Sequence, residues 1–173
     1  RAQLIIDKVR ERLLDTRQAR GLGFCVSIAH AGYMAEQFRQ HGIPAEVLSA
    51  KSSDEHRRTI QDRLQRRDIN FIFAVDLYNE GVDIPEVDTV LFLRPTESLT
   101  VFLQQLGRGL RLCDGKDFLT VLDFVGQAHR NFRFDLRFRA LLTDASTSLV
   151  EQVQDEFIYL PAGCSIWLER QAK

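Results

Sequence analysis

The chain contains 173 residues, of which 45% are hydrophobic and 27% are charged, a composition typical of one globular domain with a real core. Its formal net charge of −1 excludes a protein that binds nucleic acid through a global basic field. The three cysteines lack metal-ligand spacing, which argues against a zinc site and a disulfide framework and favours a cytoplasmic protein. No apolar run approaches about 18 residues, which argues against a membrane partner.

Beginning at the N-terminus, apolar residues at helical spacing predict a first helix over residues 2–19. We expect Gly21 and Gly23 to end this helix, because glycine weakens helices and favours their C-terminal stops. The chain opens on Arg1 rather than on methionine and leads directly into the helix. We therefore expect it to be a piece of a longer protein.

The next elements alternate between extended and helical patterns. A short apolar run predicts a buried strand at Gly23–Ala29, and helical spacing follows over residues 30–41, with Gly42 as the expected stop. A second strand, Ala45–Ser49, precedes a charged helix that ends near Arg67. Three consecutive residues are candidates for the N-cap of that helix, namely Ser52, Ser53 and Asp54.

Three further strands are predicted at Asn70–Val75, Asp88–Leu93 and Asp117–Val125, and a helix begins at Ser98 between the last two. The strands are continuously apolar, which is typical of a parallel sheet covered on both faces. The predicted fold is therefore an α/β fold of three layers, in which helices cover both faces of a parallel sheet. Ligand-binding residues should lie at the carboxyl ends of its strands.

The last part of the chain differs in character. After Asn131 a basic and aromatic segment predicts another helix to about Leu142, in which packing of phenylalanines under a charged surface is favoured over stacking on bases. A polar link, TDASTS, follows. We therefore divide the chain into one domain over residues 1–145 and, over residues 146–173, a linker with the start of a following region.

The stretch QQLGRGLR, residues 104–111, combines glycines with long cations. On a helix over residues 98–111, apolar residues form one stripe, while Gln104, Arg108 and Arg111 fall together on the opposite one. A glycine costs a helix about 1 kcal/mol relative to alanine. The glycines of this stretch therefore indicate that a large group approaches the backbone there, such as a triphosphate bound by bidentate arginine contacts. The alternative is a solvated helix end with a glycine near its stop.

A second loop, VDLYNEGVDIP, follows the third predicted strand at residues 75–85. Gly81 permits a positive φ angle or a close approach to the backbone. Asp83 could accept a hydrogen bond from a ribose hydroxyl, as acids do in other nucleotide-binding folds. The alternative interpretation is a turn with solvated acidic side chains.

Together the two stretches resemble motifs V and VI of superfamily 2 helicases and translocases, in their order and in their separation. The Q-x-x-G-R-x-x-R pattern of motif VI is present as Gln104, Gly107, Arg108 and Arg111. Residues 24–50 look like motif IV with the helix and strand after it, and residues 57–75 look like the segment that leads into motif V. The resemblance covers about residues 22–125 and is closest to the bacterial group related to type III restriction-enzyme helicase subunits and DEAD/DEAH-like DNA helicases.

The resemblance implies the second RecA-like domain of a two-domain ATPase motor, a P-loop NTPase-type fold that lacks the P-loop. ATP with Mg²⁺ would be held mainly by the N-terminal RecA-like domain of the same parent chain. Arg108 and Arg111 would be arginine fingers, and therefore catalytic, because a finger spreads the charge on the transferred phosphoryl group. Four more residues would contact the nucleotide or orient its site: Gly81, Asp83, Gln104 and Gly107.

The chain contains neither a G-x-x-x-x-G-K-[ST] phosphate loop nor a D-E-x-[HD] box, so by itself it should not hydrolyse ATP. It would be part of an ATP-dependent helicase, a nucleoside-triphosphate hydrolase, and inactive in isolation. Two residues depart from the family pattern: Val75 stands where threonine is frequent, and Gln105 where arginine is frequent. A phosphate contact at Val75 is therefore lost or made by a neighbouring amide.

In this architecture a single strand crosses the tops of both domains, and the resemblance favours DNA over RNA. Five residues after the predicted strands are candidate nucleic-acid contacts: Ser27, His30, Lys51, Ser52 and Asn79. The alternative for His30 is a helix-entry or buried, hydrogen-bonded histidine, and the alternative for Lys51 is a solvated lysine. The arginines within residues 57–67 are interpreted as a solvated helix face rather than as a DNA groove.

Two hypotheses follow for function. The first is the C-terminal motor domain of an ATP-dependent, nucleic-acid-stimulated helicase or translocase. The second is a degenerate RecA-like module that binds nucleic acid or protein partners without hydrolysis. The intact motif VI favours the first. A flavodoxin-like nucleotide binder would need a phosphate loop after the first strand, and SIAHAG is a poor one.

Overall fold

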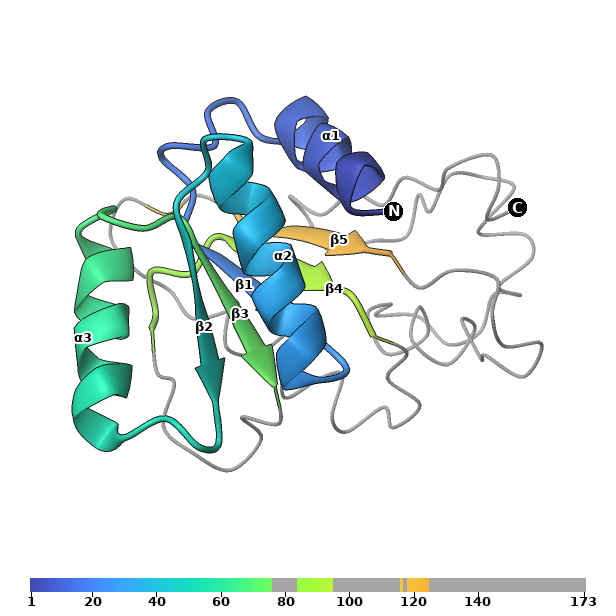
Figure 1. Cartoon of the computed structure of the whole chain (residues 1–173). Coiled ribbons are helices and arrows are strands. Elements are labelled where there is room, and N and C mark those ends of the chain that lie inside the picture. The colour runs from blue at the N-terminus through green and yellow to red at the C-terminus, as the bar shows by residue number, and fades with distance from the viewer. Residues whose placement is uncertain (76–83, 95–115, 117, 125–173) are drawn as a thin grey trace, which may run out of the picture.

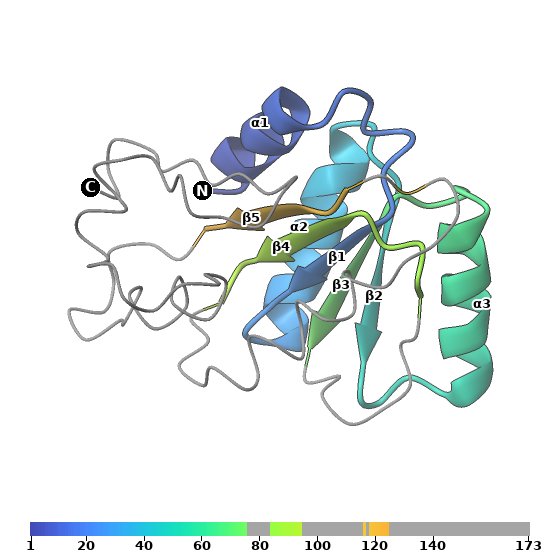
Figure 2. The same cartoon turned by 180° about the vertical axis from the view of Figure 1, so that it is seen from behind.

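The structure of the protein is a computed structural model that describes residues 1–75, 84–94, 116 and 118–124. Within these residues the strands are β1 (Gly21–Phe24), β2 (Ala45–Ser49), β3 (Phe71–Val75), β4 (Thr89–Phe92) and β5 (Thr120–Asp123). The helices are α1 (Ala2–Arg12), α2 (Ile28–Gln40) and α3 (Asp54–Gln65). All the strands pair in parallel in one sheet, in the order β2-β3-β1-β4-β5 (Figures 1 and 2).

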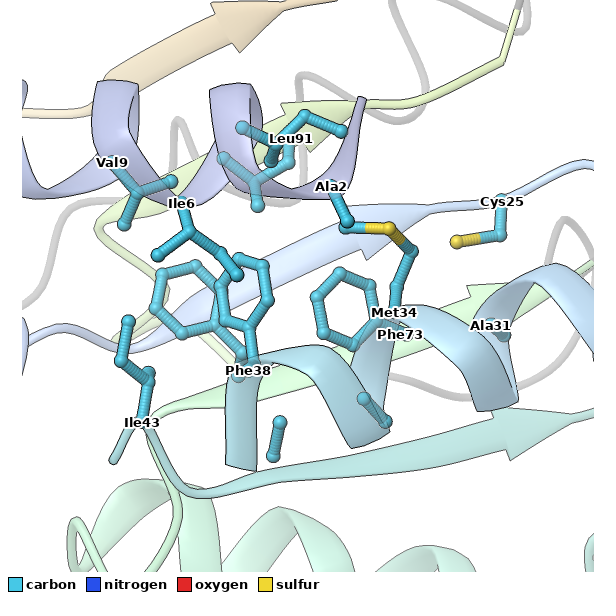
Figure 3. Close-up of a cluster of buried hydrophobic side chains, with 14 of the residues drawn as sticks. Ala2, Ile6, Val9, Cys25, Ala31, Met34, Phe38, Ile43, Phe73 and Leu91 are labelled. Atoms are coloured by element: carbon cyan, nitrogen blue, oxygen red, sulfur yellow. The ribbon is translucent and has the colours of Figure 1, made fainter. Parts of the chain in front are cut away.

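Alternate residues of the strands face two separate cores, because side chains along a strand point to opposite faces of the sheet. On one face, Phe71, Phe73 and Leu91 pack beneath α1 and α2 (Figure 3). On the other face, Ile72 and Ala74 pack against α3 and the residues around it. The sheet is thus covered on both sides, which confirms the predicted three-layer α/β fold.

The first helix is much shorter than its sequence pattern suggested. It ends at Arg12, because Leu13 adopts an extended backbone with φ −102° and ψ 130°. The predicted helix over residues 2–19 was therefore wrong in its last part, where the chain forms a loop. Gly21 and Gly23 do not end a helix, since both lie in β1, where the predicted strand had begun only at Gly23.

Two aromatic rings explain why β1 contains these glycines. A Cβ atom on Gly23 would lie 2.6 Å from Cδ1 of Phe73, and one on Gly21 would overlap the ring of Phe71. The two rings stack with their centroids 6.4 Å apart, and each meets Phe38 of α2 edge-on, at 5.0 and 4.9 Å. The glycines are therefore a steric requirement of the core.

The ends of α2 are defined by hydrogen bonds on both sides. At its start, Ser27 Oγ accepts from the backbone N–H of His30 at 3.1 Å, so the helix begins at Ile28 and the strand predicted over Gly23–Ala29 ends early. At its end, Gly42 has a φ of +76°. The N–H groups of Gly42 and Ile43 donate to the carbonyls of residues 39 and 38, each at 2.9 Å. The predicted stop at Gly42 is confirmed.

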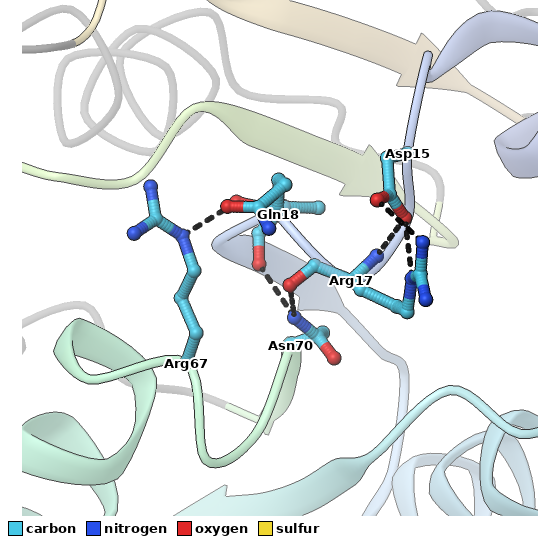
Figure 4. Close-up of polar contacts among 6 residues, drawn as sticks. Asp15, Arg17, Gln18, Arg67 and Asn70 are labelled. Atoms are coloured by element: carbon cyan, nitrogen blue, oxygen red, sulfur yellow. Dashed lines mark hydrogen bonds and ion pairs between the residues drawn. The ribbon is translucent and has the colours of Figure 1, made fainter.

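The loop before β1 is tied to the turn before β3 by polar contacts (Figure 4). Asn70, which is 2% exposed, donates through Nδ2 to the carbonyls of Arg17 and Ala19, at 2.8 and 3.1 Å. Arg67 donates through Nε to the carbonyl of Gln18 at 3.1 Å. These contacts satisfy three backbone carbonyls of the loop that precedes β1.

The predicted helix that begins at Ser98, the helix that follows Asn131 and the boundary between residues 145 and 146 lie outside the described residues. No helix of the described part is both long enough and apolar enough to span a bilayer.

Replacing Gly23 with alanine should lower the free energy of unfolding by about 1–3 kcal/mol, because the new methyl group overlaps the buried ring of Phe73. The matched control is Gly32→Ala in α2, whose added Cβ would meet no atom within 4 Å. This control should gain about 0.5–1 kcal/mol from the loss of glycine's freedom in the unfolded chain. Urea unfolding of both variants measures the difference, and a Gly23→Ala protein as stable as wild type would contradict the steric explanation.

Candidate functional site

The carboxyl ends of the strands lie together at one edge of the sheet. Their last residues are in register, since Phe24 pairs with both Ala74 and Phe92, and Ser49 pairs with Val75. β1 leads into Ser27 and α2, and β2 leads into a short turn and α3. The predicted contacts in these two loops are thereby brought to the same edge, two strand spacings or about 10 Å apart, with β3 ending between them.

Ser27 has a structural role that the sequence analysis did not recognise. Its hydroxyl oxygen caps α2 by accepting from His30 N–H, but its own hydrogen stays available for donation. The side chain is exposed, and it stands at a helix N-terminus, where backbone N–H groups and the helix dipole favour anions. The hydroxyl can therefore donate to a phosphate without uncapping the helix.

His30 lies at the entry of α2, as the alternative interpretation expected, because its backbone N–H donates to the capping Ser27 Oγ. Its ring is partly buried, and Nδ1 is shielded from solvent with no hydrogen-bond partner among the described residues. Burial lowers the pKa of His30 below its usual value of 6.5, because the imidazolium form loses hydration. The ring is thus a neutral group near physiological pH and is a poor source of positive charge for a phosphate.

The turn after β2 presents Lys51 to solvent. The N–H of Ser49 donates to Ser52 Oγ at 3.2 Å, and the N–H of Ser52 donates to the carbonyl of Ser49 at 3.0 Å. Ser52 therefore organises the turn, and Lys51, which is exposed, supplies the charge. The helix that follows is capped by Ser53, whose Oγ accepts from His56 N–H at 3.2 Å, which selects one of the three predicted N-cap candidates.

An open cavity of about 600 Å³ lies between this turn and the first turns of α3. Among the described residues it is lined by Ala50, Ser52, Ser53, Asp54, Arg57, Arg58 and Gln61. Arg57 is only 9% exposed, and its Nη2 donates to the carbonyl of Ala50 at 3.0 Å. The sequence interpretation of these arginines as a uniformly solvated face is wrong for Arg57. The sequence did indicate this burial, because Arg57 lies at helical spacing from Ile60 and Leu64, which are buried on the same face of α3.

Arg94 is another cation at this edge that the sequence analysis missed. It follows β4 and is partly buried. Its charge acts on Cys25, although burial dominates there and raises the pKa of the thiol to about 12. The described edge therefore combines two helix N-termini with Lys51, Arg58 and Arg94, an arrangement that can bind anions.

The remaining predicted site residues lie outside the described residues: Asn79, Gly81, Asp83, Gln104, Gly107, Arg108 and Arg111. Their roles stay predictions. Val75, where the family pattern often has threonine, is described, and its buried side chain packs in the core beneath α1 and α2. Over the described residues, no group of three or more His, Cys, Asp and Glu side chains is placed to hold a metal ion.

Residues 5–113 match the family model described as the helicase conserved C-terminal domain. The putative ATP-dependent helicase IRC3 of Saccharomyces cerevisiae is 30% identical over 103 residues, which cover 60% of this chain and 15% of the yeast protein. The putative mitochondrial ATP-dependent helicase irc3 of Schizosaccharomyces pombe is 33% identical over 109 residues, which cover 63% of this chain and 18% of that protein. The chain thus spans less than a fifth of these relatives.

Among solved structures, the C-terminal domain of the DEAD-box protein Dbp5 superposes with a TM-score of 0.64, over 80% of this chain and 78% of that chain. The two are 12% identical in sequence, so this likeness concerns the fold. It agrees with the parallel sheet and the two helical layers.

The burial of His30 should make the protein less stable as the pH falls. The unfolded chain takes up a proton near pH 6.5, whereas the folded chain resists protonation until the pH is lower, so stability is lost as the pH falls through this window. Urea unfolding midpoints at about pH 7.5 and 5.5 should therefore differ less in His30→Gln than in wild type. His56→Gln, at an exposed position of α3, is the matched control. An unchanged pH dependence in His30→Gln would contradict this assignment.

Proposed function

Since this chain belongs to the family of helicase conserved C-terminal domains, we propose that it is the second lobe of an ATP-driven helicase or translocase and completes an ATP site held mainly by the rest of its parent protein. The match over residues 5–113 carries the proposal, because this range contains both motif V and motif VI. Residues 1–145 would form the lobe, and residues 146–173 would link it to a following region.

Arg108 and Arg111 would act on the nucleotide. ATP supplies the phosphoryl group whose transfer to water drives the motor, and guanidinium groups placed beside it spread the negative charge that develops. Gln104 and Gly107 would orient these arginines, and Gly81 with Asp83 would contact the sugar side. Support comes from the topology, since the segment with Gly81 leaves β3, and the segment with the arginines leaves β4, at the anion-accepting edge.

No site for Mg²⁺ is found among the residues that the structure describes. The described residues offer no cluster of carboxylates that could hold a metal ion, and the sequence lacks the D-E-x-[HD] box that supplies such ligands. We therefore assign the ion to the first ATPase domain of the parent protein. Hydrolysis would then require both lobes, because each contributes groups that the other lacks.

A nucleic-acid strand would pass over the same edge of the sheet. Ser27 and Ser52 would donate to its phosphates, Lys51 would pair with one of them, and Asn79 would contact it from the motif V loop. Arg58 and the open cavity beside α3 extend this surface. The sequences of motifs V and VI favour DNA over RNA. A cytoplasmic location is proposed as well, with which the buried free thiol of Cys25 is consistent.

In the full-length parent protein, Arg111→Ala should lower the nucleic-acid-stimulated ATPase rate by about 10³–10⁵-fold, because the charge on the transferred phosphoryl group loses its partner. Steady-state turnover with and without single-stranded DNA measures the effect. Arg66→Ala is the control, because this exposed arginine follows α3 at the opposite edge of the sheet. Full stimulated turnover in Arg111→Ala would show that the finger assignment is wrong.

Lys51→Ala should weaken binding of the parent protein to single-stranded DNA and flatten its salt dependence. Each phosphate contact contributes about 0.7 to the slope of log K against log salt concentration, so the slope should fall by about that amount. Fluorescence anisotropy over a salt series provides the measurement. The control Lys8→Ala removes a lysine of α1 that pairs with Glu11 at 2.8 Å. Equal slopes for Lys51→Ala and wild type would rule out the contact.

A further inference from the structure

The open cavity beside α3 has the size and the composition of a ligand site. Its volume of about 600 Å³ falls within the range of about 300–1,000 Å³ that is typical of pockets for small molecules. Most of the described side chains that line it are polar or charged, and Asp54, Arg58 and Gln61 come from one stripe of α3. A cavity with this lining suits a ligand that forms hydrogen bonds.

Hydrogen bonds within the protein hold the walls of this cavity in place. Arg57, which is 9% exposed, donates through Nη2 to the carbonyl of Ala50 at 3.0 Å and so ties the turn after β2 to α3. Ser53 Oγ accepts from His56 N–H at 3.2 Å, which fixes the start of the helix. The cavity therefore exists before a ligand arrives, and binding does not have to order the turn or the helix start.

Two opposite charges in the lining stay apart. Asp54 and Arg58 are four residues apart on α3 with the acid nearer the N-terminus, the spacing and order that favour an ion pair on a helix. Both side chains are exposed, and neither forms an ion pair or a side-chain hydrogen bond with a residue that the structure describes. Glu36 and Arg39 of α2, three residues apart, do pair at 2.8 Å. The carboxylate of Asp54 and the guanidinium of Arg58 are thus both available to a ligand in the cavity.

A ligand that satisfies both groups must donate to a carboxylate and accept from a guanidinium. A phosphate does not, because it has the same sign of charge as Asp54. A nucleobase does, because its edges carry both donors and acceptors. Guanine matches best among the bases, since its N1–H and N2–H groups can both donate to one carboxylate, while its O6 and N7 atoms accept from an arginine.

The cavity also lies where the proposed strand would bring a base. Lys51 and Ser52 are the proposed phosphate contacts of the turn after β2, and the two neighbours of Lys51, Ala50 and Ser52, both line the cavity. The base of a nucleotide is separated from its phosphate by one sugar. A strand whose phosphate is bound at this turn can therefore place the attached base in the cavity.

We propose that the cavity beside α3 is a base-recognition pocket that takes one unstacked guanine from the bound strand. Asp54 accepts from N1–H and N2–H of the guanine, and Arg58 donates to O6 and N7. The proposal rests on the proposed function, in that Lys51 and Ser52 must hold the strand. It goes beyond that function, because contacts to phosphates position a strand, whereas contacts to a base edge read its sequence.

The test measures binding of the full-length parent protein to single-stranded DNA without ATP. Fluorescence anisotropy compares a strand of thymines with the same strand carrying guanine at every second position. The wild-type protein should bind the guanine strand about tenfold more tightly, because one good bidentate base contact discriminates by about this factor. Hypoxanthine in place of guanine, which lacks the N2 amino group, should remove most of this preference, and 7-deazaguanine, which lacks N7, should reduce it.

Two substitutions in the lining test the assignment of the donors and acceptors. Asp54→Asn should lower the preference for guanine to about twofold or less, because an amide oxygen replaces the two acceptor oxygens of the carboxylate. Arg58→Lys keeps the charge but loses the planar fork, and should have the same effect. The readout is the ratio of the two affinities, in which a general change in strand binding cancels. Glu55→Gln is the matched control, because this exposed acid of the same helix turn is not among the residues that line the cavity, and it should keep the full preference.

The outcomes separate this proposal from the proposed function. Equal affinity of the wild-type protein for the two strands would overturn the pocket and leave the phosphate contacts in place. A preference for guanine that survives both Asp54→Asn and Arg58→Lys would also overturn it, because guanine would then be recognised elsewhere. Failure of both strands to bind would overturn the proposed strand contacts together with the pocket.

Discussion

The packing of three aromatic rings against two glycines holds the described part of the protein together. Phe71 and Phe73 of β3 lie across Gly21 and Gly23 of β1, and Phe38 of α2 meets both rings edge-on. Complete burial of each ring contributes about 1.5–3 kcal/mol, and the ring contacts add to it. Because β1 presents no side chain on this face, α2 can pack closely, and the directions of β1, β3 and α2 are fixed together.

That arrangement determines what lies at the carboxyl edge of the sheet. The strands end in register, and β1 and β2 each lead into a helix capped by a serine, Ser27 for α2 and Ser53 for α3. Two helix N-termini therefore meet the edge that also carries Lys51 and Arg94. The edge is suited to anions although the whole chain has a net charge of −1, because the placement of the cations and helix N-termini, rather than the total charge, decides where the positive charge lies.

The lobe presents two surfaces with different chemistry. The carboxyl edge is polar and cationic, and it suits phosphates of a nucleotide or a nucleic acid. Beside it, Val26, Ile28 and Tyr33 are exposed apolar side chains at and near the start of α2.

The amino-acid sequence by itself determined the order of the elements, the parallel three-layer fold, the stop at Gly42 and the helicase resemblance, since continuous apolar strands, helical periodicity and short motifs are local patterns. Only the tertiary structure decided that α1 ends at Arg12, that Gly21 and Gly23 belong to a strand, and that the Arg57 guanidinium donates to the carbonyl of Ala50. The glycines depend on the rings of Phe71 and Phe73, and the loop before β1 depends on Asn70, all of which are distant in the sequence. The position of Arg57 depends on the way α3 lies against the sheet. The local periodicity of a sequence predicts which face of a helix or strand is apolar, but it does not predict which distant side chain will pack against that face.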